Sequence, residues 1–167
     1  MDTSDLSRLS PPDAVVTLRS LPRRFRTALR PTDDDNFDEF AERVASSGQS
    51  PLDHLVDADR SLTMLHKALE QVLHNDHPVL QPATIDPGGR DWPPTTAGLD
   101  GELAHLETSA NGLADLVERV PAGDWGRTGT VASGAGSVEA LDLLREAVRT
   151  AITDLRAAER DLDEVRR

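Results

Sequence analysis

The sequence lacks cysteine and tyrosine, and only 3% of its 167 residues are aromatic. Without cysteine, the chain has no disulfide, no thiolate nucleophile and no cysteine-ligated metal. With so few rings, its core has to be built from leucine, valine and alanine, which favours helices over a β-sandwich. A long apolar run is also missing, because none approaches the roughly 18 residues that span a bilayer.

Positive charge is scarce as well. The chain has 30 acidic residues but only 18 lysines and arginines, which gives a net charge of −12. An acidic surface repels phosphate backbones and anionic lipids, so we expect neither nucleic acid nor a membrane as a partner. The first ten residues contain no apolar signal core, and the cytoplasm is therefore the expected location.

Apolar residues recur at steps of three and four in four segments, as they do along one face of an α-helix. The last of these segments is the longest, and it contains no histidine. Each segment has one apolar stripe, which indicates helices that pack around a common core. The four expected helices are residues 10–31, 50–75, 99–120 and 137–166.

Capping and breaking residues set the expected helix ends. Ser10 and Ser50 are each followed by proline and, three residues on, by an aspartate, as at a capped helix start. Ser137 is the expected cap of the last helix. Pro22 is expected to kink or split the first helix, because it lacks the N–H that a helix interior needs.

The connections also carry predictions. Residues 37–44 are expected to form two helical turns with Phe37, Phe40 and Val44 packed inward. Residues 76–98 contain five prolines and Gly88-Gly89, which predicts an absence of regular helix. A link of this length lets the helices on either side of it run parallel.

These observations predict an all-α fold, a four-helix bundle with a long proline-rich crossover between helices 2 and 3. We expect one domain over residues 1–167, with residues 1–9 flexible. The glycine-rich residues 124–136 are expected to hold a tight turn or a small ribbon before the last helix.

Several segments, in order and spacing, resemble motifs of the bacterial DinB-like family, also called damage-inducible or YfiT-like. The segment 120–129 reads Val-Pro-Ala-Gly-Asp-Trp-Gly-Arg-Thr-Gly, and family members carry Val-Pro, then Trp, then Arg-Thr-Gly. The resemblance covers about residues 12 to 160 and implies a four-helix bundle. The other matching segments are 21–25 (Leu-Pro-Arg-Arg-Phe), 50–53 (Ser-Pro-Leu-Asp) and 72–80.

The resemblance implies a divalent metal on three histidines, one on the second helix and a His-x-x-x-His pair on the last. Counted from the serine that opens the second helix, the first position is Asp57. The pair falls on Arg149 and Thr153, or on Thr150 and Asp154, so neither register supplies a histidine. We therefore predict no metal and no cofactor here, although the family uses a divalent metal and, in some members, a low-molecular-weight thiol.

The expected ligand pocket lies between the second and last helices, near Asp57, Arg149 and Thr153. Asp57 and Arg149 are expected to pair there, and Arg149 would suit an anionic ligand. His54, one turn before Asp57, is either half of a catalytic pair or, more ordinarily, a partly exposed helix residue. Trp125 matches a family position and is expected to pack against the end of the bundle.

Three functional hypotheses follow. The first is a divergent bundle that has lost its metal ligands and binds a small molecule, or acts without a metal. The second is a mycothiol- or other thiol-dependent S-transferase or isomerase, which the missing ligands disfavour because a metal lowers the pKa of a thiol. The third is a non-catalytic interaction module that forms a homodimer through an exposed helix face.

Overall fold

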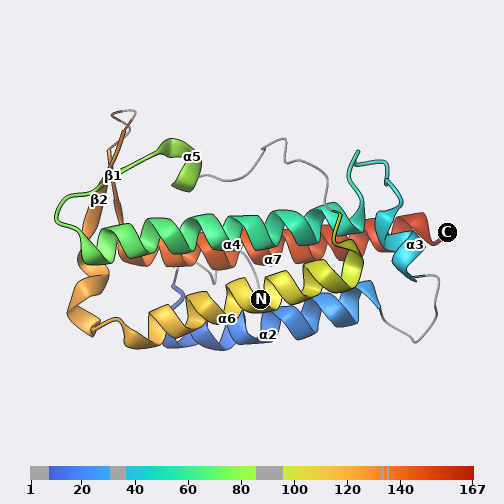
Figure 1. Cartoon of the computed structure of the whole chain (residues 1–167), viewed down its shortest axis with the longest axis horizontal. Helices are drawn as coiled ribbons and strands as arrows, with labels where there is room; N and C mark the ends of the chain where they lie inside the picture. The colour runs from blue at the N-terminus through green and yellow to red at the C-terminus, as the bar shows by residue number, and fades with distance from the viewer. Residues whose placement is uncertain (1–7, 31–36, 86–95, 133, 135) are drawn as a thin grey trace.

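Four long helices form the body of the molecule in a computed structural model that describes residues 8–30, 37–85, 96–132, 134 and 136–167. They pack as a bundle and confirm the expected all-α fold (Figure 1). The helices are α2 (Pro11–Leu29), α4 (Pro51–His74), α6 (Gly98–Arg119) and α7 (Ala140–Val165).

The first two long helices start where the caps predict. The side chains of Ser10 and Ser50 each accept a hydrogen bond from the backbone N–H three residues later. Pro22, however, does not split α2, which continues through it to Leu29. Leu21 and Phe25 beside it are fully buried, so packing against the bundle keeps the helix continuous despite the missing N–H.

The last helix starts later than predicted. Ser137 does not cap it but belongs to strand β3 (Ser137–Glu139), which pairs antiparallel with β2 (Thr128–Val131). The hairpin confirms the ribbon expected from the glycine-rich segment. Because its main-chain pairing takes residues 137–139, α7 begins at Ala140 without a side-chain cap.

The crossover contains a short strand and one helical turn, although its prolines predicted no regular helix. Strand β1 (Val79–Leu80) adds to β2 in parallel, and a single helical turn, α5 (Pro82–Ile85), follows it. The guanidinium of Arg127 donates to the carbonyls of Val72 and Asn75, which fixes the end of α4 beside the hairpin. As predicted, α4 and α6 run in the same direction on either side of the crossover (Figure 1).

Helix α3 (Phe37–Glu42) is shorter than predicted. Phe37 is buried and Phe40 is half-buried, but Val44 is 63% exposed, so the expectation that Val44 packs inward is wrong. The helix ends before Val44, and Ala41 and Ala45 take the buried positions instead.

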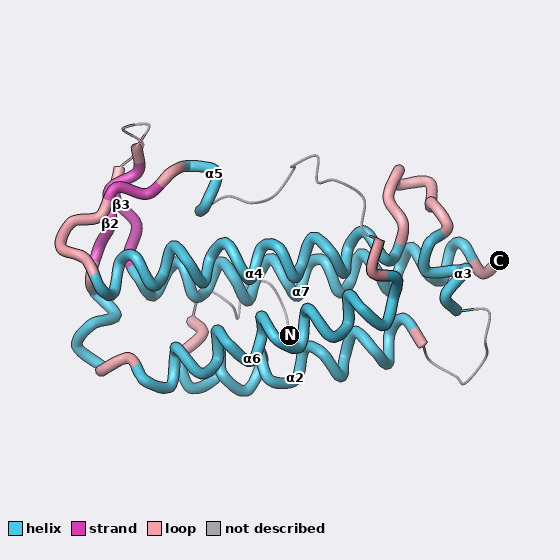
Figure 2. The backbone as a smooth tube through the Cα atoms, in the orientation of Figure 1, coloured by secondary structure: helices cyan, strands magenta, loops and turns pink. Residues whose placement is uncertain are grey.

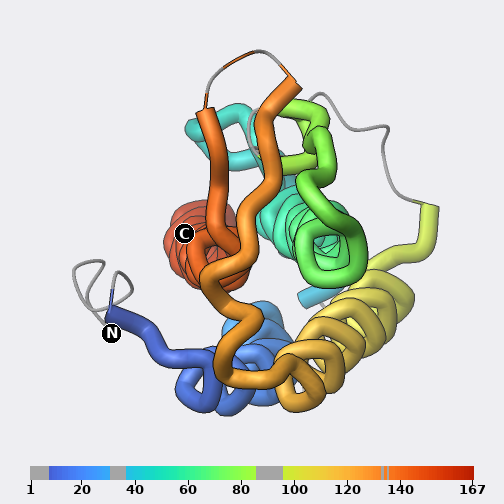
Figure 3. The backbone as a smooth tube through the Cα atoms, turned by 90° about the vertical axis from the view of Figure 1, so that its left-hand side faces the viewer, coloured from blue at the N-terminus to red at the C-terminus, as the bar shows by residue number. Residues whose placement is uncertain are grey.

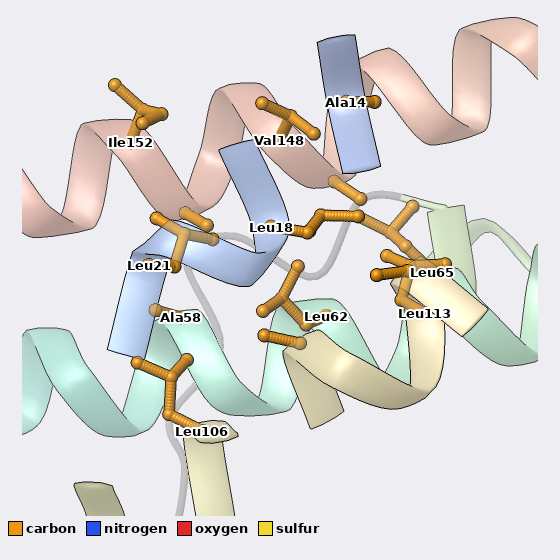
Figure 4. Packing of buried hydrophobic residues seen from close by; sticks show 14 of the residues in the cluster. Ala14, Leu18, Leu21, Ala58, Leu62, Leu65, Leu106, Leu113, Val148 and Ile152 are labelled. Atoms are coloured by element: carbon orange, nitrogen blue, oxygen red, sulfur yellow. The ribbon is translucent and has the colours of Figure 1, made fainter. Parts of the chain in front are cut away.

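The bundle has two layers, with α4 beside α7 and α2 beside α6 (Figure 3). The sheet stands at the end where α4 stops and α7 starts, and α3 lies at the other end (Figure 2). Leucine, alanine, valine and isoleucine side chains from the four helices meet between the layers, as expected from the shortage of rings (Figure 4). No helix within the described ranges is long and apolar enough to cross a membrane.

Candidate functional site

Two carboxyl groups meet in the interface between α4 and α7. Asp57 on α4 and Asp154 on α7 are both partly buried, and the charge of Asp57 acts on Asp154. α4 makes its most extensive contacts with α7, which brings these positions together. Of the two registers considered for the last helix, the structure therefore places the one with Asp154 opposite Asp57.

Asp154 is held in an unusual electrostatic environment. Burial, and then the charge of Asp57, raise its pKa from 3.8 to about 7. Its Oδ2 atom is buried and has no hydrogen-bond partner among the described residues. Burial also raises the pKa of Asp57, although the amide of Gln49 donates to its Oδ2 at 2.9 Å and opposes the shift. Asp154 therefore binds or releases a proton near neutral pH.

The structure gives the predicted partners of Asp57 other contacts. The guanidinium of Arg149 bonds to the carboxylate of Glu146, one turn earlier on α7, and its side chain is 49% exposed. The Thr153 hydroxyl is exposed and donates to the backbone oxygen of Arg149 at 2.9 Å. Asp57 and Arg149, expected to pair with each other, thus bond to different residues. Asp57 accepts a hydrogen bond from Gln49, and Arg149 pairs with Glu146.

His54 forms a buried pair that the sequence did not predict. Its Nε2 lies 2.9 Å from Oδ2 of Asp161 on α7, and both side chains are at most 7% exposed. The expectation of a partly exposed His54 is therefore wrong. Burial of Asp161 acts to raise its pKa, but hydrogen bonds from Ser47, His54 and Arg160 outweigh it and lower the pKa. His54 thereby ties α4 to α7 near the start of α4.

Both acids of α7, Asp154 and the unpredicted Asp161, follow a pattern in the sequence. Ala140, Ala147, Asp154 and Asp161 follow one another at steps of seven, so they lie on nearly the same face of α7. The first two are buried as small residues, and the last two put carboxyl groups where that face meets α4. When an acidic residue occupies one position of a series that otherwise faces the interior, it predicts a buried polar contact.

The donor set in this interface does not fit the metal that the resemblance implies. α7 contains no histidine, and the side chains at the implied positions are Asp57, Thr150 and Asp154. Within the described parts of the chain, no three His, Asp or Glu side chains gather closely enough to hold a metal ion. A three-imidazole site is therefore not available at these positions.

A second feature, the Trp125 groove, is a hollow of about 700 Å³ between the start of α2, the end of α6 and the 3₁₀ helix η1 (Ala122–Gly126). Trp125 is 9% exposed and belongs to the core, which confirms its predicted packing against the bundle end. The start of α2 and the end of α6, which line the groove, lie at the end of the bundle where α4 stops (Figure 1), whereas Asp57 belongs to the second turn of α4. Its lining includes Pro11, Pro12, Val15, Val117, Glu118 and Trp125.

The fold resembles a solved structure. YfiT from Bacillus subtilis, described as a probable metal-dependent hydrolase with an unusual four-helix bundle topology, matches with a TM-score of 0.69 and 12% identity. The match covers 92% of this chain and 85% of that chain. No protein-family model matches the sequence, and no curated protein matches it. The chain thus has a YfiT-like four-helix bundle fold, and the likeness concerns the fold alone.

Proposed function

We propose that the protein binds a small, largely apolar molecule in the Trp125 groove, without using a metal. The observation that carries this proposal is the groove itself. Its volume of about 700 Å³ suits a small organic ligand, because ligand pockets are commonly roughly 300 to 1,000 Å³ and mostly apolar. Among the described residues, Glu118 is the one ionisable residue in the lining, so hydrophobic contact provides most of the affinity.

The walls of the groove are held in place without a ligand. Arg19 on α2 donates to Asp115 and to Glu118 on α6, both at 2.8 Å, and joins the two helices beside the groove. Val117 and Trp125 are anchored in the core and are at most 9% exposed. A preformed groove loses little conformational entropy when a ligand enters.

The proposal differs from the activity ascribed to YfiT. That protein is called a probable metal-dependent hydrolase, whereas the α4–α7 interface of this chain presents Asp57, Thr150 and Asp154 in place of imidazoles. We infer that the common bundle supports a different site here, since one fold carries many functions.

The test uses two neighbouring valines on α2. Val15 lines the groove, while Val16 is 70% exposed and is not part of the lining. We expect phenylbutanol to shift amide resonances of groove residues in the wild type and in Val16→Lys, but not in Val15→Lys, where the new side chain occupies the groove. Saturable binding that Val15→Lys leaves intact, or no binding to any of the three proteins, would overturn the proposal.

A second candidate function is thiol-dependent transfer or isomerisation at the α4–α7 interface. It is favoured by the buried Oδ2 atom of Asp154, which has no hydrogen-bond partner among the described residues, in a carboxyl group whose pKa burial raises to about 7. Such a carboxylate suits a general base that takes the proton of a thiol cosubstrate, whose thiolate then attacks the electrophile.

This candidate is tested with glutathione and chlorodinitrobenzene in the absence of added metal. We expect Asp154→Asn to abolish the protein-dependent release of chloride, and the control Asp163→Asn, exposed on the same helix, to leave it unchanged. Equal rates with and without the wild-type protein would remove this candidate. The homodimer hypothesis stays a prediction, which sedimentation measurements test directly.

A further inference from the structure

We infer that the ligand of the Trp125 groove is an amphipathic cation, with an apolar body along Val15, Val117 and Trp125 and an ammonium group at Glu118. The inference rests on the proposed function, because it names the class of molecule that the same groove takes.

The charges beside the groove are unbalanced. The guanidinium of Arg19 pairs with two carboxylates, those of Asp115 and Glu118. These three groups together carry one net negative charge. The Glu118 side chain is 51% exposed and lines the groove, and its carboxylate can therefore accept a further donor. An ammonium group offers three donors and neutralises the remaining charge.

The rest of the lining gives an anion little to bind. Pro11 and Pro12 have no backbone N–H, and the valine side chains have no polar atoms. The start of α2 and the end of α6 both face the groove, and the partial charges of these two helix ends have opposite signs. The side chains therefore decide whether the groove prefers a positive or a negative ligand. The net charge of −12 also repels anions and attracts cations.

The experiment compares three probes of matched shape, phenylbutylamine, phenylbutanol and phenylbutanoate. Binding is followed through the fluorescence of Trp125 in a Trp92→Phe background, because the chain has two tryptophans. We expect the amine to bind about threefold to fivefold more tightly than the alcohol, as for one solvent-exposed ion pair. The carboxylate is expected to bind most weakly.

Two variants with the same chemistry separate the groove from the rest of α6. Glu118→Gln is expected to abolish the preference for the amine over the alcohol. Glu107→Gln removes another acid that bridges α6 to α2, through Arg26, and is expected to keep the preference, because Glu107 does not line the groove. Should Glu118→Gln fail to fold, added salt is the second measurement, and it is expected to reduce the preference in the wild type.

The outcomes distinguish the two proposals. If the alcohol binds as tightly as the amine, or if Glu118→Gln keeps the preference, the inference fails while the proposed function stands. If the carboxylate binds most tightly, the inference fails in the same way. If none of the three probes binds, both proposals fail.

Discussion

Asp154 is expected to lower the stability of the fold as pH rises. Its pKa is raised from 3.8 to about 7 because folding buries the carboxyl group near Asp57. The ionised form is thus disfavoured in the native state. The resulting loss of stability is absent below the pKa of Asp154 in the unfolded state. It grows as pH rises toward the pKa in the folded state and is constant above that value.

The magnitude follows from the size of the shift. One pKa unit corresponds to about 1.4 kcal/mol, so a rise from 3.8 to about 7 gives an upper bound on the order of 4 kcal/mol. Asp154 is only partly buried, and solvent screening reduces this value. We therefore expect Asp154→Asn to stabilise the protein by about 2 kcal/mol at roughly pH 8, where the aspartate is ionised.

The assay is urea unfolding of both proteins at a series of pH values from about 4 to about 8. The free energy of unfolding of Asp154→Asn minus that of the wild type is expected to increase through this range. Asp163→Asn, on the exposed face of the same helix, is the matched control and is expected to change little. A difference that is independent of pH, or an Asp154→Asn variant less stable than the wild type at high pH, would refute the reasoning.

Three further substitutions test the packing. His54→Ala is expected to lower the free energy of unfolding by about 3 kcal/mol in urea denaturation, because it leaves the buried carboxylate of Asp161 without its imidazole partner. Gly129→Ala is expected to cost about 1 kcal/mol, measured in the same way, because its Cβ would lie 3.1 Å from a methyl group of the buried Leu80. Ser50→Ala is expected to cost about 1 kcal/mol by thermal unfolding, since it removes the N-cap of α4.

Each of these substitutions has a control of the same type. His74→Ala changes an exposed histidine that contacts a backbone oxygen of its own helix, Gly123→Ala adds a Cβ with nothing within 4 Å, and Ser137→Ala changes an exposed serine of β3. All three are expected to have little effect on unfolding. A control that destabilises as much as its partner variant would contradict the assigned contact.

The sequence predicted the elements that local chemistry specifies. The serine caps of α2 and α4, the four amphipathic stripes and the long proline-rich link follow from rules that act within a few residues. Even so, Pro22 lies inside a continuous helix and Ser137 is a strand residue rather than a cap. Packing against the bundle outweighs the local preference at Pro22, and hairpin pairing with Thr130 outweighs it at Ser137.

The candidate sites were less predictable, because they depend on which helices become neighbours. The sequence identifies Asp57 and Trp125. It offers Asp154 in one of two alternative alignments of the last helix, and it does not identify Asp161. The rotation of α7 about its axis decides that Asp154 is partly buried near Asp57, while Arg149 stays half-exposed and pairs with Glu146 on its own helix. The Trp125 groove needs α2, α6 and η1 together, and no single segment of the chain describes it.

The amino-acid sequence by itself determined the helical class, the number of long helices, the parallel run of the helices on either side of the crossover and the absence of histidine from α7. Only the tertiary structure decided which polar groups are buried together and where the surface is hollow. The reason is that periodicity fixes which face of a helix is apolar, while burial and charge at a given atom depend on neighbours more than a hundred residues away, as for His54 and Asp161.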